Sequence, residues 1–235
     1  MLKKMLSIIT LTVCTSIMCL SAVNATPIQA AEAPVKNYTQ YPGVPIYYDE
    51  NVTENETQAI AEAYLMLPNN IKEMLFNNCV NFYVEDYQDV NRTRKTKSGT
   101  RVAFVTNATY AKKSTGEIRK VSNAFVTVGV HNPKVTPQNL AFGVLHEVGH
   151  VIDAAYAGGY PVTQSMLNVT PTADWQNIYP SELDTLFTLL PSQGASNASQ
   201  EVFAHAFALY ILKNEELRQS CPGTYAYVEN IVNSF

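Results

Sequence analysis

Apolar and polar positions along the chain predict helices first, then strands, then helices again. Apolar residues at helical spacing run from Ala59 to Leu67, behind a typical helix start at Thr53-Glu54-Asn55-Glu56, and Pro68 ends the run. A second, short helix is predicted over 70–76. Strand-like runs rich in β-branched and aromatic residues follow at 80–84, 101–106 and 124–130, with polar turns at 91–99 and 112–116 between them.

The second half of the chain is predicted to be mainly helical. Leu140, Val144, Val148 and Val151 mark the apolar stripe of a helix over 137–156, which Gly158-Gly159 ends. The stretch from Thr163 to Ser192 is irregular apart from a helix around 182–190. Further helical segments are predicted over 197–212, 215–220 and 225–232, and Asn197-Ala198-Ser199-Gln200 has the spacing of a capping box. This order of elements predicts a compact α+β domain.

The N-terminal residues are predicted to be a targeting segment and not part of the fold. Lys3 and Lys4 precede an apolar run from Leu6 to Val23, and Val23-Asn24-Ala25 is a small-residue cleavage site. Cleavage near Ala30 or Ala31, and an uncleaved membrane anchor, are the alternatives. We therefore expect a signal peptide over 1–25, a proline-containing extended leader over 26–52 and a folded domain over 53–235 of a secreted, extracellular protein.

Composition narrows the classes of function. The chain has 235 residues, of which 46% are hydrophobic and 15% charged, enough apolar residues for one domain with a sizeable core. The formal net charge of −4 argues against nucleic-acid binding through phosphate attraction. No segment after the predicted signal is apolar enough to span a membrane. Signal cleavage would leave Cys79 and Cys221, either as one disulfide or as two separate buried thiols.

The most informative motif is His146-Glu147-Val148-Gly149-His150. On a helix, residues four positions apart lie on one face, so the two imidazoles can reach a single zinc ion. Glu147 follows the first histidine and can take a proton from a metal-bound water. Two surface histidines on an amphipathic helix are the alternative interpretation. The apolar neighbours of the motif, Leu145, Val148 and Val151, speak against it.

A catalytic zinc site needs a third protein ligand, and three residues are candidates. Asp153 shares the face of His150, but its short side chain suits the orientation of a histidine better than metal binding. His205 could serve chemically. Glu201 is the best choice, because it begins a second helix whose apolar face can pack against the first. The alternative for Glu201 is an acid favoured in the first helical turn by the helix dipole.

Taken together, His-Glu-Val-Gly-His-Val-Ile-Asp (146–153) and Asn-Ala-Ser-Gln-Glu-Val-Phe-Ala-His-Ala-Phe (197–207) resemble the anthrax lethal factor-type metallopeptidases, which include the secreted Pro-Pro endopeptidases. The similarity covers most of the chain after about residue 53. It implies zinc ligands His146, His150 and Glu201, with Glu147 as general base. It also implies a single-domain zincin-like fold, in which a small twisted sheet has an edge strand beside the helix of the first motif.

Two positions depart from the family pattern. The family usually has a tyrosine seven residues before the ligand glutamate, where its hydroxyl is thought to stabilise the oxyanion, and this chain has Gly194 there. Tyr179 and Tyr160 are the nearest substitute donors in sequence. His205 stands where the toxin carries an acid and would orient the ligands from the second helix together with Asp153. Loss of one oxyanion donor costs about 10²–10³ in rate, so these departures bear on efficiency.

The sequence therefore predicts a secreted zinc metalloendopeptidase that hydrolyses extended peptides of extracellular or host proteins, with proline-containing cleavage sites implied by the resemblance alone. The substrate would pair with an edge strand, for which 124–130 is the candidate. The loops around Lys112-Lys113 and Asp174-Trp175-Gln176 are candidate pocket walls, although a single tryptophan such as Trp175 is more often a core anchor. We expect neither a nucleic acid nor, after signal cleavage, a membrane as partner. The alternative is a secreted pseudoprotease that binds zinc and peptide without efficient turnover. A zinc-stabilised structural protein ranks last, because no fourth protein ligand is apparent.

Overall fold

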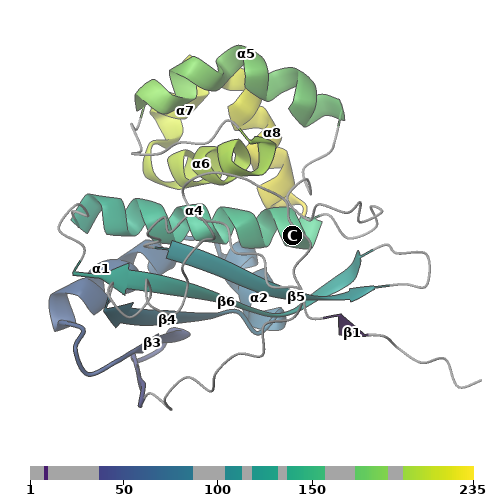
Figure 1. Ribbon diagram of the computed structural model, residues 1–235. Helices are drawn as coiled ribbons and strands as arrows, with labels where there is room; N and C mark the ends of the chain where they lie inside the picture. The colour runs from purple at the N-terminus through teal and green to yellow at the C-terminus, as the bar shows by residue number, and fades with distance from the viewer. Residues whose placement is uncertain are drawn as a thin grey trace, which may run out of the picture.

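The computed structural model describes residues 8–9, 37–86, 104–112, 118–131, 137–156, 173–189 and 198–235. These residues form an α+β structure with a sheet at one side and helices stacked upon it (Figure 1). Within the described part of the chain, no helix is both long and apolar enough to cross a membrane.

The sheet has six described strands in the order β1-β5-β6-β4-β3-β2. Their bounds are β1 Ile8–Ile9, β2 Thr39–Gln40, β3 Ile46–Tyr48, β4 Asn81–Asp86, β5 Phe104–Lys112 and β6 Ile118–Val130. β6 is central, because it pairs in parallel with β4 and antiparallel with β5. The prediction that 124–130 is an edge strand is therefore wrong. β5 and β6 are longer than the predicted strands at 101–106 and 124–130, because their cross-strand pairing continues to Lys112 and Ile118.

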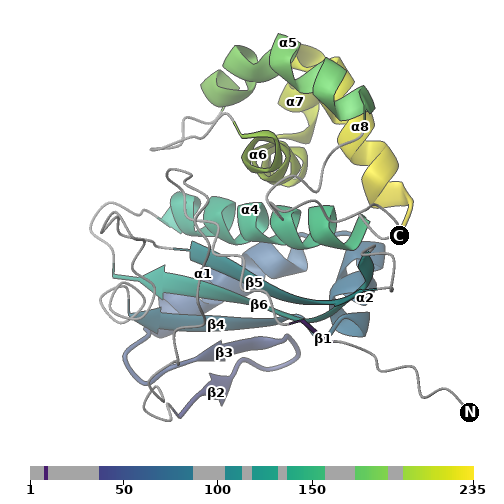
Figure 2. The ribbon, with the colours of Figure 1, turned by 45° about the vertical axis from the view of Figure 1, so that its right-hand side comes forward.

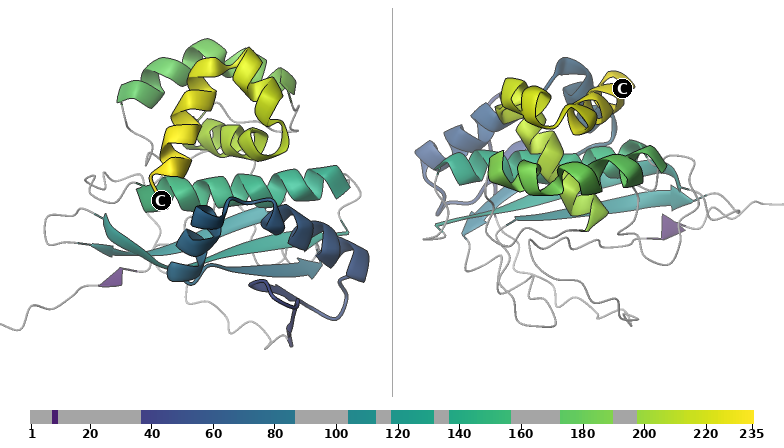
Figure 3. Two further views of the ribbon diagram at one scale, coloured as in Figure 1. Left: turned by 180° about the vertical axis from the view of Figure 1, so that it is seen from behind. Right: turned by 90° about the horizontal axis from the view of Figure 1, so that it is seen from above.

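The helices form two layers above one face of the sheet (Figures 1 and 3). The first layer contains α1 Glu54–Leu65, α2 Asn69–Asn77 and the long α4 Pro137–Tyr156, which packs against β5, β6 and α1. The second layer contains α5 Ala173–Leu189, α6 Ser199–Leu212, α7 Asn214–Ser220 and α8 Pro222–Asn233. In Figure 2, α6 is seen nearly end-on between α4 and α5.

Both central helices are buried on more than one side. In α4, Val144, Val148 and Val151 are fully buried, and in α6 every residue from Gln200 to Leu209 is buried. A helix that is apolar around its circumference is stable only when other elements cover all its faces. The sheet and α1 cover α4 from one side and α6 covers it from the other, so the two helices that carry the motifs meet deep in the molecule.

Several predicted elements agree with the structure. The helix over 137–156 has the predicted bounds. Thr53 is the N-cap of α1 and forms a complete capping box with Glu56. By contrast, α6 begins at Ser199 with Ala198 as its N-cap and has no side-chain cap, while Asn197 lies outside the described residues.

Two regions differ from the prediction because long-range packing decides them. Residues 39–48, assigned to the leader, contribute β2 and β3, and Ile46 is fully buried where β3 pairs with β4. α5 begins at Ala173 and continues through Pro180. Trp175 lies in this helix and not in a pocket wall: it is fully buried, stacks on Tyr179 and Tyr227, and its Nε1 donates to the Ser199 carbonyl.

Cys79 and Cys221 are separate free thiols. Cys79 is exposed in the turn after α2, and its φ of 53° lies in the left-handed region. Cys221 is buried between α7 and α8, and burial raises its pKa to about 11. The disulfide alternative is therefore not realised in this structure.

Candidate metal centre

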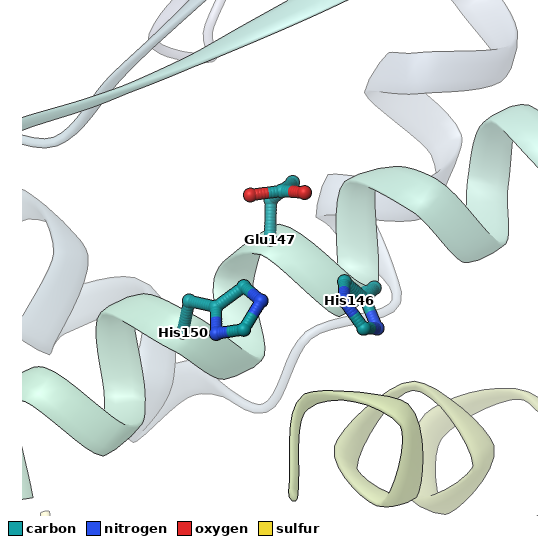
Figure 4. Close-up of side chains that lie close together, drawn as sticks. All are labelled: His146, Glu147 and His150. Atoms are coloured by element: carbon teal, nitrogen blue, oxygen red, sulfur yellow. The ribbon is translucent and has the colours of Figure 1, made fainter. Parts of the chain in front are cut away.

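Helix α4 brings His146, Glu147 and His150 to one place near its middle (Figure 4). Their candidate ligand atoms lie within 4.8 Å of one another, and the three residues are only 5%, 0% and 7% exposed. Figure 4 shows the two imidazole rings on consecutive turns, with the Glu147 carboxylate projecting between them on another side of the helix. The burial rules out the alternative of two surface histidines.

Glu201 approaches the same imidazoles from α6. Its Oε2 lies 3.2 Å from Nε2 of His146, and its Oε1 lies 3.6 Å from Nε2 of His150. Glu201 is 8% exposed, so this carboxylate is buried together with both rings. The structure thus brings together three side chains that the sequence predicts to converge from two separate helices.

The spacing of these atoms fits a zinc ion. Ligands that each lie about 2.1 Å from a tetrahedral zinc are separated by about 3.4 Å. The two distances from Glu201 to the imidazoles, 3.2 Å and 3.6 Å, bracket that value. Glu147 also belongs to a cluster of candidate ligand atoms with His146 and His150, all of which lie within 4.8 Å of one another. We favour Glu201 as the third ligand, which leaves the Glu147 carboxylate for proton transfer.

The position of Glu201 follows from how α6 is built. Glu201, Ala204, His205 and Ala208 recur at helical spacing, are all buried, and form one face of this helix. α4 and α6 pack closely against each other. Hydrogen bonds from α5 hold the first turn of α6, since Trp175 Nε1 donates to the Ser199 carbonyl and Gln176 Nε2 donates to Ser199 Oγ.

Electrostatics couple Glu201 to the histidines. Burial alone would lower the pKa of His150, but the carboxylates around it, Glu201 above all and then Glu147 and Asp153, raise it to about 9. Burial alone would raise the pKa of Glu201, but His150 and His146 hold it well below its usual range. Without a metal, protonated His150 and Glu201 therefore form a buried ion pair. A metal cation bound at the same place would replace the proton of His150 as the positive charge beside Glu201.

Asp153 and His205 lie beside this cluster. Asp153 is 4% exposed and close enough to His150 to contribute to its raised pKa. His205 is 2% exposed, and its ring meets those of Phe142 and Phe187 edge-on, at 5.0 Å from each. Burial first, and then His146, lower the pKa of His205 to about 3, so its ring stays neutral.

Of the two tyrosines proposed as oxyanion donors, only Tyr179 lies among the described residues. Tyr179 lies in α5, where its ring stacks on Trp175 at 5.4 Å. Tyr160 lies outside the described residues, as does Gly194. The identity of an oxyanion donor remains a prediction.

Two features of the described structure do not follow from the sequence pattern. Gly149, between the two histidines, lies against the backbone of Ala204 in α6. Its position in the interior of a predicted helix could have indicated this contact. A glycine there lowers helix stability by about 1 kcal/mol relative to alanine, so close packing is the usual reason for its presence. The second feature is His131 at the end of β6, whose ring contacts Asp86 and Glu56. No motif in the sequence indicates this contact.

Comparison with known proteins gives a family match over most of the chain. The family described as "Anthrax toxin lethal factor, N- and C-terminal domain" matches residues 29–231. No curated protein matches. Among solved structures, the Pro-Pro endopeptidase PPEP-2 from Paenibacillus alvei is similar at 16% sequence identity, with a TM-score of 0.48, over 79% of this chain and 94% of that chain.

Proposed function

The chain belongs to the anthrax toxin lethal factor family, and from this premise we propose that it is a secreted, zinc-dependent endopeptidase. The observation that carries the proposal is the convergence of His146, His150 and Glu201 within 3.2 Å and 3.6 Å, beside a buried Glu147. The donor set of two imidazoles and one carboxylate is typical of catalytic zinc sites, which keep a position for water.

In this proposal His146, His150 and Glu201 hold zinc, which when bound lowers the pKa of a water molecule and polarises the scissile carbonyl. Glu147 takes the proton of the attacking water and returns it to the leaving amine. Asp153 orients His150 from the same helix, and His205 supports the site from α6 as a neutral ring. Burial of the whole group excludes bulk water and strengthens each of these electrostatic interactions.

An extended peptide would bind along β5. β6 is paired on both sides, whereas the outer side of β5 is paired, among the described strands, only at Tyr110 and Ala111 with β1. β5 also packs against α4, which carries the site. A substrate strand added there would gain main-chain hydrogen bonds and present its scissile bond near α4. β1 lies within the predicted signal peptide, so its removal would free the rest of this edge.

Secretion rests on the predicted signal over 1–25, and N-terminal sequencing of protein from the culture medium would test it. Substrate preference rests on the motif resemblance, which includes the Pro-Pro endopeptidases and makes peptides with adjacent prolines the first to assay. A pseudoprotease that binds peptide without efficient turnover is the second candidate, favoured by Gly194 at the family's tyrosine position.

The direct test is cleavage of a peptide library by protein lacking residues 1–25, with zinc and after chelation. A metallopeptidase forms products only with zinc, and product formation returns when zinc is added back. Single-turnover assays separate the two candidates, because the pseudoprotease binds zinc and peptide but forms no product. Activity that chelation leaves unchanged would contradict the zinc-dependent mechanism.

A further inference from the structure

Gly149 of α4, directly before His150, lies against the backbone of α6 at Ala204. A Cβ atom added to Gly149 would lie 2.7 Å from Cα of Ala204, 3.1 Å from its carbonyl oxygen and 3.2 Å from its Cβ. Two of these three atoms belong to the backbone of α6. A side-chain rotation therefore cannot relieve the overlap, and only a shift of one helix relative to the other can.

This contact lies among the candidate ligands on both helices. Gly149 lies one helical turn after His146, three positions along α4, and directly precedes His150 in the sequence. Ala204 shares the face of α6 with Glu201 and His205 and is fully buried. The residue pair at the helix crossing is thus flanked by His146 and His150 on α4 and by Glu201 on α6.

We propose that Gly149 is a positioning residue, which sets the separation of α4 and α6 and thereby the distance from the Glu201 carboxylate to His146 and His150. The inference rests on the proposed function, since it concerns a zinc ion shared by these three side chains. It assigns to the fourth residue of the motif a role that is neither metal binding nor proton transfer.

The magnitudes support this role. Carbon atoms in contact prefer a separation of at least about 3.5 Å, so a methyl group at position 149 would require a shift of roughly 0.8 Å from the 2.7 Å approach. Distances in a metal site are held to about 0.2 Å. The shift required exceeds the tolerance of the site several-fold, whereas the same shift in a purely apolar contact would only loosen the packing.

The test compares Gly149→Ala with a matched control, Gly223→Ala. Gly223, in α8, is also crowded, though less severely and by side chains alone: an added Cβ would lie 3.1 Å from Cγ2 of Ile178 and 3.2 Å from Oε1 of Glu182. Both of those atoms belong to side chains of α5 and to neither zinc-binding helix. The control therefore reports the effect of a crowded methyl group on stability alone.

Zinc affinity is measured by competition with a chromophoric chelator, and ligand geometry by the visible absorption of the Co²⁺-substituted protein. Far-UV circular dichroism and the Tm of the chelated protein report the fold. We expect Gly149→Ala to lower zinc affinity about 10–100-fold, the range typical of residues that position metal ligands, and to alter the Co²⁺ spectrum. Gly223→Ala should lower the Tm but leave zinc affinity within about twofold of the unsubstituted protein.

If Gly149→Ala does not fold, Ala204→Val enlarges the facing residue of the same contact and should weaken zinc binding in the same direction. Unchanged zinc affinity and Co²⁺ spectrum in a folded Gly149→Ala or Ala204→Val protein would overturn the role of Gly149, with the proposed function intact. Absence of zinc binding by the unsubstituted protein would overturn both.

Discussion

In the described part of the chain, histidines lie beside carboxylates in two clusters, which differ in burial and in the ratio of histidines to carboxylates. Between α4 and α6, the carboxylate of Glu201 lies between two imidazoles, and all three side chains are at most 10% exposed. At the end of β6, the ring of His131 lies between two carboxylates, 3.0 Å from Glu56 and 2.9 Å from Asp86, and is 36% exposed.

Because of this difference in burial, we propose a cation site for the first cluster and only a surface contact for the second. Two buried imidazoles that share one carboxylate present several donor atoms in a space from which water is excluded, where an unpaired charge is costly. A metal ion bound by these side chains would offset the free-energy cost of burying the charge. The contacts of His131 with two acids join the ends of β4 and β6 to the N-terminus of α1. Because water can replace these exposed contacts, they contribute little to the free energy of unfolding.

The largest expected effect concerns Glu147, the proposed general base. Glu147→Gln keeps the size and burial of the side chain but removes the proton acceptor. We expect kcat/KM for a cleaved peptide to fall about 10²–10⁴-fold while zinc content stays at one per chain. Steady-state kinetics and metal analysis of the same preparation check this. Full activity in Glu147→Gln would remove the assignment of this residue as general base.

Next in size is the loss of the carboxylate between the imidazoles. Glu201→Gln should lower zinc affinity by more than about 100-fold, beyond the effect of residues that only orient ligands. Glu56→Gln, at the His131 cluster, is the matched control and should leave zinc affinity unchanged. Chelator competition measures both. Equal zinc affinity in the two variants would contradict the contrast between a buried metal centre and a surface contact.

A third effect is the pH dependence of the metal-free protein. The pKa of His150 is raised from 6.5 to about 9, so the stabilisation from its ion pair is complete below pH 6.5 and is lost as the pH rises through 9. The pKa of Glu201 is lowered from 4.5, so its contribution is complete above pH 4.5 and is lost on further acidification.

His205 acts in the opposite direction to His150: its pKa is lowered to about 3, so below pH 6.5 the unfolded chain gains a proton that the folded protein does not bind. The chelated protein should therefore be most stable near pH 6.5. Its free energy of unfolding should fall by on the order of 2 kcal/mol towards pH 9. Urea unfolding at a series of pH values measures this change, and Glu201→Gln should flatten it. Zinc affinity should rise over the same interval, because zinc must displace the proton of His150.

The smallest effect is expected at the surface cluster. Asparagine tolerates the left-handed φ of 61° at position 131, so His131→Asn removes the ion pairs without straining the backbone. The free energy of unfolding should decrease by less than about 1 kcal/mol, with zinc affinity and kcat unchanged. Chemical denaturation and the peptide assay check this. A loss of zinc binding in His131→Asn would show that the two clusters are coupled.

Much of the helical architecture was predictable because its signals are local. The capping box at Thr53 and Glu56 requires four consecutive residues, and the bounds of α4 follow from one apolar stripe between a proline and a glycine pair. Less of the sheet was predictable. The central position of β6, the membership of β3 and the helical course of α5 through Pro180 depend on partners distant in sequence.

The sequence by itself determined which groups carry the chemistry. The spacing of His146, Glu147 and His150 places two imidazoles and a carboxylate on adjacent turns of any α-helix that forms there. The reason is that the relative positions of side chains on an α-helix follow from their separation in sequence. It also identified Glu201 as the acid at the start of a second apolar helix. Only the tertiary structure decided how near that acid comes, because the distance is set by the packing of α4 on α6, where Gly149 contacts the backbone of Ala204.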